Sequence, residues 1–186
     1  MSVISTIKMT ARQFIQLGED PVGVRLELVD GEVAVSPSPT PRHSHAITQL
    51  IIILGNHIAA KGLGELYQDV DTILEQFSVR RPDLLFFSKN RVGLVGEKAM
   101  EGPPDLAVEV LSPSSIQTDR VDKFAEYCRA GVKHYWIVDP LHQTIEAWNL
   151  VGPKYADAGS GQGMAVVKLE PFPDLEIPLG RLWRGR

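Results

Sequence analysis

The sequence predicts a mixed α/β (α+β) fold in which a curved central sheet is flanked by helices, with an extra N-terminal hairpin and late antiparallel strands. Three observations support this class: an Asp-Gly turn between alternating segments, a long amphipathic helix pattern, and a strand–helix–strand order over residues 105–139. A chain of 186 residues without a recognisable linker predicts a single domain, 1–186.

The N-terminal part predicts a short helix followed by a hairpin. Residues 11–17 fit a helix that Gly18 ends. The segment GVRLELVDGEVAVSP then alternates between apolar and polar residues on both sides of Asp30-Gly31. Because Asp-Gly readily adopts the backbone angles of a two-residue turn, we expect paired strands at 24–29 and 32–36.

The longest predicted helix follows a proline-rich connector. The connector, SPSPTPRH, covers residues 36–43, and the helix is expected over 43–60. Apolar residues recur in this helix at spacings of three and four, as on one face of a helix. They are Ile47, Leu50, Ile51, Leu54 and Ile58. Gly62 and Gly64 then end the helix.

The central part of the chain predicts strands separated by a loop. Residues 65–87 contain two or three strands, the last of which follows Asp83 in RPDLLFF. Residues 93–104 hold Gly and Pro without a clear period and predict a loop. The run DLAVEVL, residues 105–111, is rich in Val and Leu and is closed by Ser-Pro-Ser, so it predicts a buried strand.

A helix and further strands complete the prediction. The helix is expected over 118–130, with Gly131 as its stop. Its apolar residues predict a buried stripe of Val121, Phe124, Ala125 and Cys128. KHYWIVDP predicts the next strand, which a crossover through the helix would place parallel to residues 105–111. QTIEAWNL and MAVVKLE predict late antiparallel strands.

Composition and charge narrow the function classes. The net charge is −4, so contact with nucleic acid would need a local basic patch. The single cysteine, Cys128, excludes an internal disulfide and a cysteine-based zinc site. The most apolar run, at 50–55, is too short to cross a bilayer, and residues 1–14 lack the apolar core of a signal peptide. We therefore expect a cytoplasmic protein without a membrane partner.

Two acidic residues stand beside apolar strand residues, where a carboxylate needs a partner. Glu109 lies in the middle of LAVEVL, and Asp83 directly precedes LLFF. Burial of a carboxylate is costly unless a cation, a metal or several donors stabilise it. On neighbouring strands the two carboxylates would repel each other, and a divalent cation such as Mg²⁺ or Mn²⁺ would remove that repulsion. The alternative for Glu109 is a structural ion pair with Arg80 or Arg81, and Asp105 is the alternative to Asp83 as the second acid.

A hydrolytic metal site usually also contains a lysine. Two residues after Glu109 the sequence has Leu111, so that position is apolar. Lys123 on the following helix is the best replacement, because a lysine there could hold the attacking water or stabilise the developing charge. Arg120 is its rival. Glu27, in RLELVD, is a third acid between apolar residues and a further candidate for the site.

Three segments together resemble one known family. RRPDLLFF, PPDLAVEVLSPSS and DRVDKFAEYCRAGVKHYWIVDP are similar to the Uma2 family, which is placed among the PD-(D/E)XK restriction-endonuclease-like nucleases. The resemblance extends from about MTARQF to VVKLEPFPDLEI. It implies a restriction-endonuclease-like core with Asp83 and Glu109 as metal ligands and Lys123 as a relocated lysine. ELVDGEV and RHSHAITQL also resemble the family's N-terminal pattern, which implies that Glu27 and His45 approach the site.

The sequence and this resemblance together predict an endonuclease that hydrolyses DNA phosphodiester bonds with Mg²⁺ or Mn²⁺. Asp83 and Glu109 would hold the metal with help from the Val110 carbonyl. Lys123 would act on water or charge, and Glu27 would assist. We expect a homodimer, because cutting both strands generally calls for two active sites. The alternative, favoured by the acidic charge and the apolar residue in the usual lysine position, is a catalytically inactive binding or assembly module.

Overall fold

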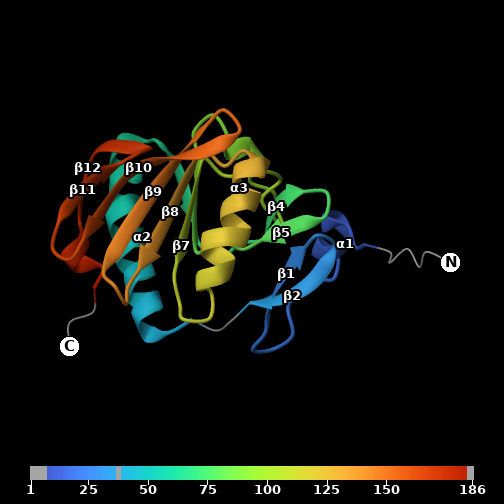
Figure 1. The fold of residues 1–186 in the computed structure, drawn as a ribbon. Coiled ribbons are helices and arrows are strands. Elements are labelled where there is room, and N and C mark those ends of the chain that lie inside the picture. Colours follow the sequence, from blue (N-terminus) through green and yellow to red (C-terminus); the bar gives the residue numbers. More distant parts are fainter. Residues whose placement is uncertain (1–7, 37–38, 184–186) are drawn as a thin grey trace.

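The computed structural model describes residues 8–36 and 39–183, and its core is a six-stranded mixed sheet (Figure 1). The strand order is β10-β9-β8-β7-β6-β3. Within this sheet β7 and β8 are parallel, as the sequence predicts for strands on either side of a helix, and the other neighbours are antiparallel. The strands are β3 (Gly64–Tyr67), β6 (Leu84–Ser88), β7 (Leu106–Val110), β8 (His134–Asp139), β9 (Thr144–Val151) and β10 (Lys154–Gln162). The predicted mixed α/β class is confirmed.

Two smaller sheets extend this core. The first has the order β2-β1-β5-β4, and the second pairs β11 with β12. Their strands are β1 (Arg25–Val29), β2 (Glu32–Ser36), β4 (Thr72–Glu75), β5 (Ser78–Arg80), β11 (Val166–Leu169) and β12 (Phe172–Pro178). The predicted N-terminal hairpin is β1–β2, and its turn residues Asp30 and Gly31 have φ values of 51° and 82°. A two-residue hairpin turn with positive φ at both positions favours Asp-Gly.

Helix α2 (Pro41–Lys61) begins two residues earlier than the predicted helix over 43–60. The Thr40 side chain accepts a hydrogen bond from the His43 amide, and proline at the first helical position suits a helix start. Gly62, with φ 59°, ends the helix. Residues 37 and 38 of the predicted connector lie outside the described residues. The early start puts His43 in the first turn, on the buried side of the helix.

The predicted helix over 118–130 consists of two parts with different winding. Thr118–Lys123 form a π-helical turn, which continues into α3 (Phe124–Ala130) and ends at Gly131. The predicted apolar stripe is wrong for Val121 and Ala125, which are exposed, whereas Phe124 does pack against the core. The buried residues of this segment are Asp119, Lys123, Glu126 and Tyr127. The remaining helical elements are α1 (Ala11–Ile15), which is shorter than predicted, and 3₁₀ turns at Val92–Leu94 and Leu179–Arg181.

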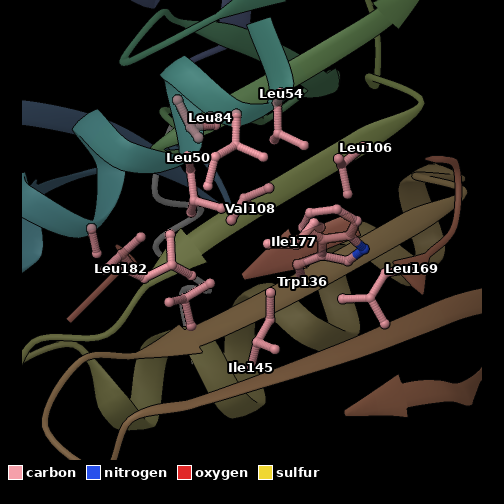
Figure 2. Packing of buried hydrophobic residues seen from close by; sticks show 14 of the residues in the cluster. Leu50, Leu54, Leu84, Leu106, Val108, Trp136, Ile145, Leu169, Ile177 and Leu182 are labelled. Atoms are coloured by element: carbon pink, nitrogen blue, oxygen red, sulfur yellow. The ribbon is translucent and has the colours of Figure 1, made fainter. Parts of the chain in front are cut away.

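Successive residues of β7 point to opposite sides of the main sheet, which α2 and α3 cover. Val108 and Val110 pack in one cluster with Leu50 of α2, and Figure 2 shows this packing. Ala107 on the same strand packs in a second cluster with Tyr127 of α3. Burial on both faces explains why the strand reads as a continuous apolar run with one exception, Glu109.

Several strands differ from the sequence prediction. Residues 64–88 form four strands, β3 to β6, where two or three were expected. β10 and β12 were not predicted. β10 is rich in glycine and lies at the edge of the sheet, where pairing with β9 supplies its backbone hydrogen bonds. Among the described residues, no helix combines the length and the apolarity that crossing a lipid bilayer requires.

Candidate active site

Asp83 and Glu109 meet where β6 begins and β7 ends. Leu84 pairs with Val108 in the antiparallel register, so the next step places Asp83 opposite Glu109. Directly opposed residues of antiparallel strands share a face of the sheet, with Cβ atoms about 4.5–5.5 Å apart. Asp83 Oδ2 also accepts a hydrogen bond from the Val110 amide at 2.7 Å, which fixes the carboxylate against the end of β7. The two acids that the sequence singled out therefore lie together.

Glu109 is buried, and two groups contact it from the helix side of the sheet. The residue is 2 % exposed. The Tyr127 hydroxyl donates to Oε1 at 2.6 Å, and the Lys123 ammonium lies 3.0 Å from the same oxygen. Burial, and then Glu109, raise the pKa of Tyr127 well above its usual value, so this hydroxyl stays a donor. The predicted alternative, an ion pair of Glu109 with Arg80 or Arg81, is absent from the described residues.

Lys123 reaches the site from the π-helical turn and is surrounded by carboxylates. Its Nζ lies 3.0 Å from Glu109, 3.2 Å from Asp119 Oδ1 and 3.8 Å from Glu27 Oε1. Burial would lower the pKa of Lys123, but Glu109 and the other acids outweigh it and raise this pKa. Leu111, at the usual lysine position, packs in the apolar cluster beneath α3. The lysine that the strand lacks is thus supplied by the helix.

Burial and charge pairing act against each other at Glu109. Burial is the largest influence and raises the pKa of Glu109 well above its usual value, whereas Lys123 opposes this shift. We infer that Glu109 is a carboxylate and Lys123 an ammonium, because three carboxylates surround the lysine and Tyr127 donates a hydrogen bond to Glu109.

Glu27 lies at the rim of the same cluster but is largely held by arginine. Its Oε2 accepts from Arg80 Nη1 at 3.2 Å and its Oε1 from the Arg81 amide at 3.0 Å. Burial would raise the pKa of Glu27, but Lys123 and Arg80 hold it below its usual value. Glu27 is therefore a charged partner of Lys123, with fewer free oxygen atoms than Asp83 or Glu109.

His43, and not His45, is the histidine at the site. His43 Nε2 lies 3.1 Å from Asp83 Oδ2, whereas His45 Nε2 contacts the Arg181 carbonyl at 3.2 Å. The expectation that His45 approaches the site is wrong. The two residues lie on different sides of α2, and His43 shares the buried side with Ala46 and Leu50.

The rival residues Arg120 and Asp105 take part in other ion pairs. Arg120 donates to both carboxylate oxygens of Glu146, at 2.9 and 2.7 Å. Asp105 lies before the other end of β7 and binds Arg91, Lys133 and the Ser88 amide. Both therefore serve structural contacts away from Glu109.

Asp105 makes a pH-dependent contribution to stability. Burial would raise its pKa, but the hydrogen bonds from Lys133 and Ser88 outweigh burial and lower it. A lowered folded-state pKa stabilises the protein above the unfolded value of about 3.9, and the contribution is lost as the pH falls towards the folded value. Asp105→Asn should therefore lower the free energy of unfolding by about 1–3 kcal/mol at pH 7 and by less at pH 3.

Urea unfolding at both pH values measures the Asp105 effect. Asp122→Asn is the matched control, because Asp122 is exposed and the charge change is the same. If Asp105→Asn lowers the free energy of unfolding by the same amount at pH 7 and at pH 3, the contribution of Asp105 is not ionic.

The clustered side chains border a cleft of about 40 Å³. Its lining includes Glu27, His43, Asp83, Glu109, Asp119 and Lys123, together with Val110. Among the described residues, no hydrogen-bond donor contacts Asp83 Oδ1 or Glu109 Oε2. Asp119 Oδ1 is buried and also lacks a hydrogen-bond partner there, although it lies in ion-pair range of Lys123.

This donor set fits one kind of metal ion. Residues 8–36 and 39–183 contain no group of three His, Cys, Asp or Glu side chains arranged as a metal cage. Mg²⁺ does not need such a cage, because it usually binds one or two carboxylates and completes its shell with waters and substrate phosphate oxygens. Two adjacent carboxylates, each with one oxygen free and facing a small cleft, satisfy that requirement.

Sequence reasoning missed three members of the cluster. Asp119 was not considered, Tyr127 was unassigned, and His43 was passed over for His45. For Asp119 a signal does exist, because it precedes Lys123 by four residues and such a spacing brings side chains together on a helix. The same spacing links Tyr127 to Lys123, which it follows by four residues, and His43 to Ile47 of the predicted apolar face, which it precedes by four.

Comparison with known proteins identifies the family and a related fold. A solved structure described as "a putative nuclease belonging to DUF820" from Anabaena variabilis superposes with a TM-score of 0.78 and 20% sequence identity, over 94% of this chain and 97% of that chain. Comparison with curated proteins gives no match. The family model "Uma2: Putative restriction endonuclease" matches residues 11–180. The chain therefore belongs to the Uma2 family.

Proposed function

We propose that this protein is a Mg²⁺- or Mn²⁺-dependent endonuclease that hydrolyses DNA phosphodiester bonds. The observation that carries the proposal is that Asp83 and Glu109 line one cleft at the end of β7, with the Lys123 ammonium 3.0 Å from Glu109. The family description and the name of the structural neighbour add support, since both refer to nucleases.

The metal would be held by the free oxygens of Asp83 and Glu109, with the Val110 carbonyl as a further ligand. A metal bound there would polarise a phosphoryl oxygen and lower the pKa of a water molecule. Phosphoryl transfer depends mainly on positioning and on stabilisation of charge, so the remaining tasks fall to the surrounding side chains.

Each surrounding residue has a task that follows from its contacts. Lys123 orients water or stabilises the charge that develops on the phosphate. Tyr127 donates to Glu109 Oε1 and so leaves Oε2 towards the cleft. His43 and the Val110 amide both contact Asp83 Oδ2, which likewise leaves Oδ1 free. Glu27 holds the ammonium of Lys123 near the acids.

Cleavage of DNA by the purified chain tests the proposal. Supercoiled, linear and branched DNA would be incubated at low salt with Mg²⁺, with Mn²⁺ or with EDTA, because phosphate contacts weaken as salt rises. We expect divalent-dependent nicking or cleavage. Light scattering on the same sample tests the expected homodimer, which would place two active sites on one duplex.

One observation favours the alternative of a binding or assembly module without catalysis. Two arginines that line the cleft are already paired, Arg25 with Asp69 and Arg81 with Asp71 and Asp20. Fewer cations are then available for a DNA backbone. No cleavage of any DNA with either metal, together with a defined complex with DNA or a protein, would establish this alternative.

A further inference from the structure

Asp119 is the buried acid of the cluster to which the proposed function gives no task. It is 2 % exposed and lines the cleft. Its Oδ1 has no hydrogen-bond partner among the described residues, yet it lies 3.2 Å from Lys123 Nζ. A buried carboxylate oxygen without a hydrogen bond is costly, so its retention calls for an explanation.

Lys123 is placed between two carboxylates that compete for it. Its Nζ is 3.0 Å from Glu109 and 3.2 Å from Asp119, so a small rotation of the side chain shifts the ammonium from one acid to the other. Glu109 Oε1 keeps the Tyr127 hydrogen bond if Lys123 leaves. Asp119 gains the donor that its Oδ1 lacks.

A divalent cation on Glu109 and an ammonium 3.0 Å from the same carboxylate repel each other. We propose that Asp119 is a positioning residue that receives the Lys123 ammonium when Glu109 binds a divalent cation. This inference rests on the proposed metal-dependent function. Asp119 then keeps Lys123 charged and close to the reacting phosphate while Glu109 is released for the metal.

The inference distinguishes Asp119 from a direct metal ligand, because its effect should pass through Lys123. Asp119→Asn leaves Lys123 bound more strongly to Glu109, so the protein should bind metal about 10–100-fold more weakly. Lys123→Gln removes the competing cation and should strengthen metal binding at least ~10-fold. In the Lys123→Gln background, Asp119→Asn should have no further effect, since there is no ammonium left to receive.

Isothermal titration of the metal-free full chain with Mn²⁺ alone measures these affinities without any activity assay. Asp122→Asn is the matched control, because Asp122 belongs to the same π-helical turn and is exposed. Lys123→Gln leaves buried acids without their cation, so thermal melts would verify folding, and Lys123→Met provides a second neutral variant. The comparison of Asp119→Asn with Asp122→Asn needs neither lysine variant.

Four outcomes would overturn the inference. If Asp119→Asn weakens Mn²⁺ binding equally in the wild-type and the Lys123→Gln backgrounds, Asp119 is a direct metal ligand. Unchanged affinity of Asp119→Asn, or weaker binding by both neutral Lys123 variants, would show that the lysine does not compete with the metal. A wild-type chain that binds no Mn²⁺ in this titration would contradict the metal-dependent function itself and this inference with it.

Discussion

Replacing either Asp83 or Glu109 by alanine is expected to abolish metal-dependent DNA cleavage. Each variant removes one of the two carboxylates that line the cleft where β6 begins and β7 ends. Loss of a single preorganised electrostatic contact in an active site commonly lowers the rate by about 10²–10³-fold, and loss of a metal ligand should reach at least this range. Nicking of supercoiled DNA in the presence of Mg²⁺ measures the effect.

Two further variants test whether the loss of cleavage is specific to Asp83 and Glu109. Asp105→Ala changes the rival acid, which binds Lys133 and Arg91 away from Glu109, so it should keep cleavage activity when the protein is folded. Lys123→Ala should lower the rate strongly without preventing metal binding. Cleavage that persists in both Asp83→Ala and Glu109→Ala would come from another site or from a contaminant, and the proposed site would be refuted.

The largest effect on stability is expected for Arg80→Ala. Arg80 is 3 % exposed and donates to Glu126 Oε2 from Nε and Nη2, at 2.7 and 2.6 Å. Its Nη1 donates to Glu27, and the Ser78 hydroxyl donates to the other oxygen of Glu126. Removing the guanidinium leaves Glu126 without its cation among the described residues and leaves Glu27 with only Lys123, 3.8 Å away. Breaking a buried ion pair on one side typically costs about 3–5 kcal/mol.

Urea unfolding at pH 7 measures the Arg80 effect, and Arg120→Ala is its control. Arg120 also binds a carboxylate with two hydrogen bonds, but its side chain is 35% exposed and such pairs contribute about 0–1 kcal/mol. A loss below about 1 kcal/mol for Arg80→Ala would show that the buried network contributes little. The network joins β1, β5 and α3, so its loss should also displace Glu27 from the active site.

Local patterns were sufficient to predict much of the fold. The hairpin at Asp30-Gly31, the long helix over most of Pro41–Lys61, and the strand at Leu106–Val110 all depend on residues close together in the chain. Their turns and periodicities are determined by backbone angles and by the alternation of apolar residues. The same logic placed Asp83 and Glu109 together, because both lie at apolar strands that prove to be neighbours.

Elements without a local pattern were missed. β10 contains glycines and polar residues that do not favour a strand, but the exposed edge of β9 supplies its hydrogen bonds. Gly161 in β10 is required by close packing, since a side chain there would collide with Val167 and Leu179. Such requirements come from segments that meet only in the folded chain.

The side of the helix over residues 118–130 that faces the interior also depends on tertiary contacts. An apolar stripe normally marks the buried side of a helix, and the predicted stripe included Val121. Val121 is exposed and Lys123 is buried instead, because the interior already contains carboxylates from β1 and β7 that stabilise a buried ammonium.

The sequence by itself determined the mixed α/β class, the family resemblance, and Asp83, Glu109 and Lys123 as candidate site residues. Only the tertiary structure decided that Lys123 and not Arg120 contacts Glu109, that His43 and not His45 contacts Asp83, and that Asp119 and Tyr127 complete the cluster. The physical reason is that the cost of burying a charge depends on its partners. Those partners come from β1, β7, α2 and the π-helical turn, which are distant in sequence and converge only when the sheets and helices pack.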